Sequence, residues 1–260
     1  MPNLVGIGLS QVPTNSMLGG LAYQDPEHAS IKDLDLKNLS QINSEIADTA
    51  VDIFVYDTRK DSDGGAWRKR TQHTSWYNET LGTATRGTRK EFPAVAVLVL
   101  ETSKLTIYDG DDPDLPMWMV FNTKAEEYYL ISGNNDHDLR CVAALNGIIV
   151  TGNAPSYNHG GVIQVNFVKD DGFATSHTTN KRWTGGILNR NSDDYWITVG
   201  DGNYISINSA RDVAMTVLPN ALIDDSTGLP VPTIAVACGT AGSANGGVSV
   251  IKDDGSVVDI

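Results

Sequence analysis

The sequence predicts an all-β protein: a β-propeller-like domain of repeated antiparallel hairpins, preceded by an extended N-terminal arm with one short helix. Three observations indicate this fold. Apolar and polar residues alternate in many short runs after residue 48, turns rich in Gly, Asn and Asp separate the runs, and one hairpin motif occurs twice. We therefore expect an attachment and oligomerisation arm over residues 1–47 and a β domain over residues 48–260.

The arm has little apolar surface of its own. Its first 22 residues are rich in Gly, Ser, Asn and Pro, and their apolar residues follow no clear period. Residues 33–47 are the best helical candidate, because four aliphatic residues lie near helical spacing: Leu36, Leu39, Ile42 and Ile46. A helix this short is unstable alone in water, so it either packs on the surface or clusters with its copies about a symmetry axis. The arm as a whole is either disordered or ordered by another subunit.

The hydrophobic period changes to two after residue 48. We expect strands at residues 51–56, 66–70, 94–100, 104–108, 117–121, 128–131, 147–150, 162–168, 195–199, 204–207, 214–218, 233–237, 248–251 and 257–260. The first two would form a hairpin around the turn at residues 61–65. Many short strands with regular turn signals predict a sandwich, a barrel or a propeller.

An internal repeat favours the propeller. The segment GGVIQVNFVKDDG at residues 160–172 is echoed by GGVSVIKDDG at residues 246–255. The offset of 86 residues is twice about 43, the length of a four-stranded blade, so the motifs would be hairpins of alternate blades. Residues 48–260 would then supply about five blades. A propeller must close its ring, so either the last strand pairs with an early one or the chain is part of a longer polypeptide.

Charge and cysteine content exclude several classes of protein. The net charge is −13, and it is uneven: ten Lys or Arg accompany eleven Asp or Glu in residues 1–90, whereas nine accompany twenty-one afterwards. Such a surface repels phosphate, so we expect no nucleic-acid partner. Residues 59–90 are locally basic and form either a solvated face or a docking surface for an acidic neighbour. Cys141 and Cys238 lie in apolar runs and are expected to be reduced core residues. No apolar run is long enough for a membrane helix, and no secretory signal is visible.

Motifs for chemistry are missing from the sequence. It has no Gly-x-Ser-x-Gly motif, and its glycine-rich segments are not followed by Lys-Ser or Lys-Thr. The histidines do not have ligand spacing, and Asp136-His137-Asp138 is expected to be an exposed turn. The acidic turns at residues 61–64 and 109–114 either hold calcium or are tight turns without metal. We therefore expect a non-enzymatic protein and assign no catalytic, cofactor-binding or metal-binding residue.

Residues 61–67, DSDGGAW, resemble the Asp-box turn of sialidase-like propellers, Ser-x-Asp-x-Gly-x-Thr-Trp. Asp61 replaces the serine and Trp67 arrives one residue early. In that family the box is a structural hairpin, so the resemblance implies a fold and no activity. Eight aromatic residues lie beside polar or glycine-rich loops and serve either as half-buried packing or as platforms for sugar rings: Trp67, Trp76, Tyr77, Trp118, Tyr157, Trp183, Tyr195 and Trp196.

The first half of the chain resembles tail-fibre and tail-associated structural proteins of marine tailed bacteriophages, those infecting cyanobacteria in particular. The residues that carry this are QVPTNSMLGGLAYQDP at 11–26, the segment 31–46, RKEFPAVAV at 89–97 and IYDGDDPDLPMW at 107–118. The resemblance implies an arm docked on the tail, copies related by symmetry (threefold in many fibres) and a β-rich body. It transfers no functional residue, because the family has no fixed receptor or catalytic set at these positions.

Together these observations predict a virion structural protein of a phage tail, such as a tail fibre. It would assemble in the host cytoplasm, dock through residues 1–47 and use residues 48–260 for assembly or host-surface binding. Its expected partners are other tail proteins, copies of itself in a trimer, and a host-surface glycan, with no nucleic acid and no membrane insertion. Two alternatives stay open: a glycan-degrading propeller enzyme of the depolymerase or sialidase type, and a cellular scaffold propeller that binds peptides.

Overall fold

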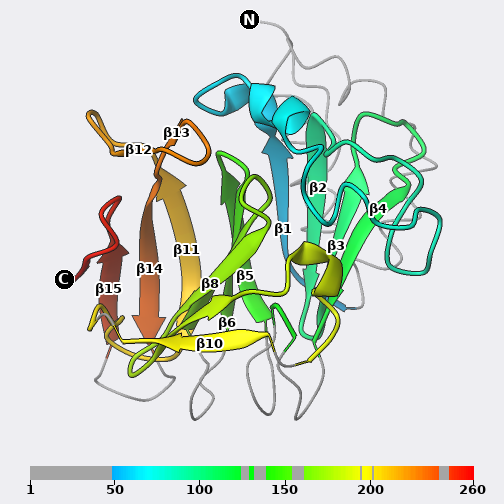
Figure 1. Cartoon of the computed structure of the whole chain (residues 1–260). Helices are drawn as coiled ribbons and strands as arrows, with labels where there is room; N and C mark the ends of the chain where they lie inside the picture. Colours follow the sequence, from blue (N-terminus) through cyan, green and yellow to red (C-terminus); the bar gives the residue numbers. More distant parts are fainter. Residues whose placement is uncertain are drawn as a thin grey trace, which may run out of the picture.

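The computed structural model describes residues 49–123, 129–131, 139–153, 161–193, 195–200, 202–239 and 246–260. This part of the chain is all-β and its strands pair antiparallel, as the sequence predicts. Three main sheets lie side by side, and a two-stranded hairpin stands beside the third (Figure 1). The expected arm over residues 1–47, its helix at residues 33–47, and the turn Asp136-His137-Asp138 lie outside the described residues.

The first sheet is a four-stranded meander of β1 (Ala50–Asp57), β2 (Val95–Glu101), β3 (Lys104–Asp109) and β4 (Met117–Asn122). The long β1–β2 connection carries two short 3₁₀ helices, η1 (Thr58–Lys60) and η2 (Ala66–Arg70). The prediction of a strand at residues 66–70, paired with β1, is therefore wrong. Gly65 adopts a left-handed conformation with φ 78°, which starts a 3₁₀ turn, and the buried Trp67 anchors that turn to the core.

The second sheet has six strands in chain order: β5 (Leu139–Leu145), β6 (Ile148–Asn153), β7 (Gly161–Asn166), β8 (Asp171–Thr175), β9 (Asn180–Trp183) and β10 (Trp196–Val199). A 3₁₀ helix, η3 (Ile187–Asn189), lies between β9 and β10. The third sheet pairs β11 (Ala210–Thr216), β14 (Thr233–Gly239), β15 (Gly246–Ile251) and β16 (Val257–Asp259). The hairpin of β12 (Ile223–Asp224) and β13 (Leu229–Pro230) is inserted between β11 and β14.

The first strands of the three sheets bring the sheets together. β5 lies beside both β1 and β11, and its side chains alternate between two cores. Val142 and Ala144 belong to the core shared with the first sheet, whereas Cys141 and Ala143 belong to the core shared with the third. Because β5 is buried on both faces, it lacks the alternation that marks a half-exposed strand. The sequence analysis predicted no strand there, although it predicted β2, which is buried on both faces too.

The repeated motif lies in consecutive sheets, which corrects its interpretation as alternate blades. Residues 161–166 and 246–251 form β7 and β15, the third strands of the second and third meanders. The offset of about 86 residues therefore separates equivalent strands of two neighbouring sheets. It is longer than one four-stranded blade because the second sheet adds β9 and β10 after its fourth strand. The described residues form three meander sheets and the small hairpin, so the estimate of about five blades was too high.

Most other strand predictions are confirmed within a few residues, but two are not. Residues 204–207 form no strand, because the buried Ile205 anchors this segment and its N–H donates to the Ser176 carbonyl over 3.1 Å. Of residues 128–131, the described positions 129–131 are not a strand either. Leu130 and Ile131 are fully buried, so their apolar character reflects core packing and not sheet pairing.

Candidate functional site

One cleft lies between the outer strands of the second sheet and the third sheet. Its cavity volume is about 330 Å³, within the range of small-molecule sites. One wall comes from β7, β8 and β9, and the other from β14, β15 and the loop that follows β15. The β12–β13 hairpin adds Asp224, Leu229 and Pro230. The cleft is thus built from segments that the topology brings together over more than a hundred residues of sequence.

The wall formed by the second sheet is polar because of strand alternation. In β7, Ile163 and Val165 point into the core shared with the first sheet, so Gln164 and Asn166 point the other way, into the cleft. The strand register then aligns Gln164 with Phe173 of β8, and Phe173 with Arg182 of β9. A half-buried aromatic ring is therefore flanked by an amide and a guanidinium in one row across three strands.

Charges of both signs line the cleft in equal number. Lys169, Arg182 and Lys252 are the cations, and the three anions are Asp171, Asp224 and Asp253. Four of these groups form pairs: Arg182 Nη2 lies 3.1 Å from Asp171 Oδ2, and Lys169 pairs with Asp224. Asp253 accepts a hydrogen bond from the Leu222 N–H over 2.7 Å. The cleft therefore has no large net charge with which to attract an ion.

The opposite wall is mainly apolar. Ile234 and Ile251 face the cleft from β14 and β15, where they are directly paired in the register, and Pro230 and Pro232 extend this surface. A polar wall facing an apolar wall suits a ligand that has both kinds of surface.

Asp224 does not have the environment of a general acid. Burial alone would raise the pKa of Asp224, but hydrogen bonds from Lys169 and Ser226 and the charge of Lys169 lower it overall. A carboxyl group that donates a proton at neutral pH needs a raised pKa. Asp171 is held by Arg182 in addition. Asp224 and Asp171 are thus each held by a cationic side chain of the cleft.

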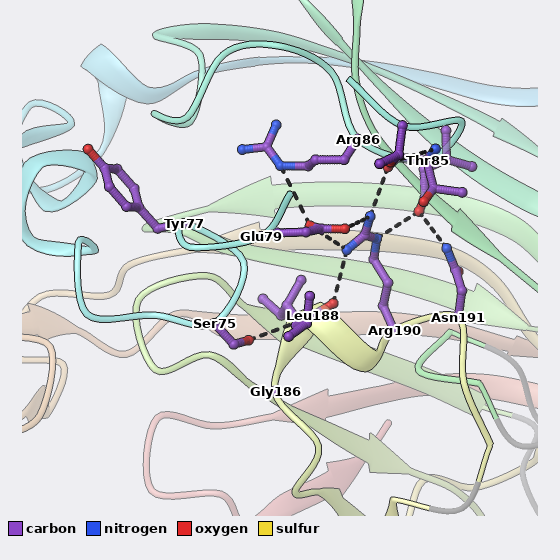
Figure 2. A network of polar contacts seen from close by, with 12 residues as sticks. Ser75, Tyr77, Glu79, Thr85, Arg86, Gly186, Leu188, Arg190 and Asn191 are labelled. Atoms are coloured by element: carbon purple, nitrogen blue, oxygen red, sulfur yellow. Dashed lines mark hydrogen bonds and ion pairs between the residues drawn. The ribbon is translucent and has the colours of Figure 1, made fainter. Parts of the chain in front are cut away.

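A second polar cluster is closed and structural. Glu79 lies between Arg190 and Arg86 (Figure 2). Arg190 donates to both Glu79 oxygens over 2.9 Å, and its other N–H groups donate to the carbonyls of Thr85, Val120 and Ile187. Arg86 is fully buried, with its guanidinium 4.4 Å from the Trp118 ring centre, and burial lowers its pKa to about 10. These contacts occupy the guanidinium of Arg190, so it has no spare donor for a ligand.

The rest of the basic segment is also largely engaged within the chain. Ion pairs join Arg59 to Asp57, Arg70 to Asp63, and Arg89 to Asp109 and Asp111. Lys90 lies over the Tyr77 ring. These partners reduce the positive charge that residues 59–90 can offer to an acidic neighbour.

The acidic turn at residues 109–114 is held by an arginine. Arg89 Nη1 donates to Asp109 and Asp111, each over 2.8 Å. Asp111 also accepts from the backbone N–H groups of Ala94 and Val95. In the part of the chain that the structure describes, no three His, Cys, Asp or Glu side chains converge as metal ligands.

The turn at residues 61–67 joins the first two sheets. The buried Asp61 accepts hydrogen bonds from the Tyr56 hydroxyl (2.6 Å), the Trp67 indole (2.7 Å) and the Asn146 N–H (2.8 Å). The Gly147 N–H in turn donates to the Tyr56 hydroxyl over 2.7 Å. Burial raises the pKa of Asp61 although these donors oppose the shift. The turn is therefore structural, like the box that it resembles.

The aromatic residues singled out in the sequence mostly fill the core. Trp67, Trp76, Trp118 and Trp183 are fully buried, and the first three pack with Phe92 and Phe167 between the first and second sheets. Tyr77, Tyr195 and Trp196 pack partly buried against the same core, and Tyr157 lies outside the described residues. Both cysteines are buried and free, as predicted.

The sequence analysis did not single out the row of residues that lines the cleft, Gln164, Phe173 and Arg182. Gln164 lies inside the repeated motif, which drew attention for its period alone, and neither Phe173 nor Arg182 was singled out. The alternation of Gln164 and Asn166 with apolar residues in the segment 162–166 could have indicated this row, because it places amide side chains on one face of an otherwise apolar strand.

Comparisons with known proteins do not indicate a function for this chain. No protein-family model matches the sequence, and no curated protein matches it significantly. Within the described ranges, no helix has the length and apolar character required to cross a membrane.

Proposed function

We propose that this chain is a non-enzymatic structural protein of a bacteriophage tail, such as a fibre component. Residues 1–47 dock it on the tail, and the β domain over residues 48–260, a propeller-like body, serves in assembly and host-surface binding. Its partners are other tail proteins and copies of itself in a symmetric oligomer. The resemblance of the first half to tail proteins motivates this proposal, and one surface of the β domain supports it.

The supporting observation is an aliphatic outer face on the third sheet. The register aligns Ala214, Ala235, Val250 and Val258 across all four strands. In the next row on the same face, Val248 pairs with Ile260 through two backbone hydrogen bonds. Val258 is 46% exposed and Ile260 is 82% exposed. A continuous row of exposed aliphatic side chains on a sheet is typical of a protein–protein interface.

A second copy of the chain is the occupant that we infer for this face. Within the chain, each sheet packs face to face on the next, through one core between the first and second sheets and another between the second and third. The third sheet continues this series but presents its outer face to solvent. A sheet from a second copy would extend the same packing, and a rotation that closes such contacts gives a ring.

Light scattering tests the self-association. Val258→Lys places a charge at the centre of the face, and because Val258 is nearly half exposed the monomer should still fold. Leu188→Lys is the matched control, since Leu188 is 47% exposed on η3, away from the third sheet. We expect the wild type and Leu188→Lys to be oligomers and Val258→Lys to dissociate. A monomeric wild type, or an intact Val258→Lys oligomer, would contradict this interface.

Mass spectrometry of purified phage particles tests the assignment to the tail. We expect peptides of this chain to co-purify with tail proteins in fixed stoichiometry, whereas their absence from intact particles would refute the assignment.

The alternative of a glycan-degrading enzyme is favoured by one feature, the three carboxylates in the cleft. It predicts release of reducing sugars from host polysaccharide, abolished by Asp253→Asn.

A further inference from the structure

We propose that the cleft between the second and third sheets binds a neutral saccharide, with Phe173 as the platform for a sugar ring. This inference rests on the proposed role in host-surface binding and names its site and ligand class. The first strands of the three sheets, β1, β5 and β11, are adjacent, and the cleft lies between later strands of the second and third sheets. Between the first and second sheets, aromatic residues of the β1–β2 connection fill the wedge, among them Trp67, Trp76 and Phe92. The wedge between the second and third sheets has no such filling and stays open.

Phe173 is the aromatic side chain that the lining of this wedge contains. It is half-buried, and the described structure places it outside every hydrophobic core cluster. An aromatic face is electron-rich, and the C–H groups on one face of a pyranose carry slight positive charge, so the two surfaces pack together. A partly exposed phenylalanine in the middle of a polar sheet face costs free energy without a ligand, because part of its ring contacts water. A ligand with an apolar face would cover it.

The groups around Phe173 match the edge of a sugar ring. Gln164 lies beside it on β7 and offers both a donor and an acceptor, and the described structure gives its side chain no hydrogen-bond partner. Arg182 lies on the other side, on β9, and its guanidinium is held by Asp171. Sugar hydroxyls both donate and accept, so they can bind an amide and an arginine–carboxylate pair at the same time. Pro230 and Val231, partly exposed apolar residues of the opposite wall, would contact the other sugar face.

The balance of charge selects a neutral saccharide over an acidic one. The lining holds three cations and three anions, and two of the cations are paired with lining carboxylates. A carboxylated or sulfated sugar would find Lys252 as the one cation that is not paired with a lining carboxylate, next to the carboxylate of Asp253, and it would approach a chain of net charge −13. A neutral hexose needs no cation and is not repelled by this net charge. Extended peptides bind by pairing with a sheet edge, whereas this wall is formed by the interior strands β7, β8 and β9.

Saturation-transfer NMR with the full chain tests this inference. The probes are the methyl glycosides of glucose, galactose and mannose, with the methyl glycoside of N-acetylneuraminic acid as the acidic comparison and a mixed tripeptide library as the peptide comparison. We expect binding of at least one neutral glycoside and of neither comparison. Phe173→Leu keeps the apolar volume but removes the ring, and it should weaken binding about tenfold. Phe173→Trp should keep it.

Two further variants separate a binding defect from misfolding. Gln164→Ala removes an amide that no described residue holds, so it should weaken sugar binding and leave the unfolding midpoint unchanged. Leu188→Ala changes an exposed apolar residue outside the cleft and should leave binding unchanged. The inference is overturned if no neutral glycoside binds, if Phe173→Leu binds like the wild type, or if the acidic sugar or the peptides bind more tightly. The particle composition is measured independently, so failure here leaves the tail assignment standing.

Discussion

Replacing Glu79 with glutamine removes the carboxylate that two buried arginines share. Arg190 is 1% exposed and donates twice to Glu79, and Arg86 Nε lies 3.6 Å from the same carboxylate. Glutamine keeps one acceptor oxygen, but its amide would face a guanidinium N–H, and both positive charges would stay buried without a counter-charge.

The structure sets the expected size of this effect. Removing one partner of a buried ion pair costs ~3–5 kcal/mol. Arg86 and Arg190 keep their backbone carbonyl acceptors, which include Trp118 and Val120. These hydrogen bonds solvate the charges in part, so we expect the lower end, ~3 kcal/mol. For a chain of this size that lowers the melting temperature by about 6–12 °C.

Urea unfolding followed by tryptophan fluorescence measures the change, because Trp118 packs under Arg86 and is buried in the core. Glu101→Gln is the matched control, since it makes the same chemical change in the partly exposed Glu101–Lys104 pair and should cost less than about 1 kcal/mol. If Glu79→Gln also costs less than about 1 kcal/mol, the cluster is not the closed, charge-balanced network described above.

Three further predictions follow from buried groups. Asp61→Ala leaves three buried donors without an acceptor and should cost at least ~3 kcal/mol in urea unfolding; a change below ~1 kcal/mol would contradict its structural role. Burial raises the pKa of Cys141 to about 12, and Cys238 is buried too, so Ellman's reagent at pH 8 should react with neither thiol until the chain unfolds; rapid native labelling would refute this. Burial also raises the pKa of Asp52, so the folded state binds its proton more tightly than the unfolded state does, and stability falls as pH rises from below 3.8 through the folded pKa. Asp52→Asn should therefore gain stability over the wild type at pH 7 and lose that gain below pH 3.8, and a gain independent of pH would show that the charge is not its cause.

The strand predictions succeeded on half-exposed and on fully buried strands alike. In β7 and β15, alternation and the flanking Asp-Gly turns gave both the type and the position of the strand. β2 is buried on both faces and was still predicted, whereas β5, also buried on both faces, was not, because its apolar run was attributed to core packing around Cys141. The 3₁₀ helix η2 was mistaken for a strand because the turn at residues 61–65 was interpreted as a hairpin turn, whereas the buried Trp67 anchors a 3₁₀ helix after it.

The candidate site could not have been predicted as a unit. Its two walls come from β7–β9 and from β14–β15, and only the packing of the third sheet on the second places Phe173 opposite Ile234. The sequence also directed attention to tryptophans, four of which the structure buries fully. Their burial follows from the wedge between the first two sheets, where the long β1–β2 connection inserts Trp67 and Trp76. Neither the pairing of the cleft walls nor the burial of these tryptophans can be predicted from residues that are close together in the sequence.

Electron cryomicroscopy of the intact parent particle tests the central claim, that this β domain is a tail component assembled through its third sheet. The account predicts density for the chain in the tail, with Val258 and Ile260 covered by a neighbouring copy and the Phe173 cleft open to solvent. Density in which that aliphatic face contacts only water, or a tail that does not contain the chain, would contradict it.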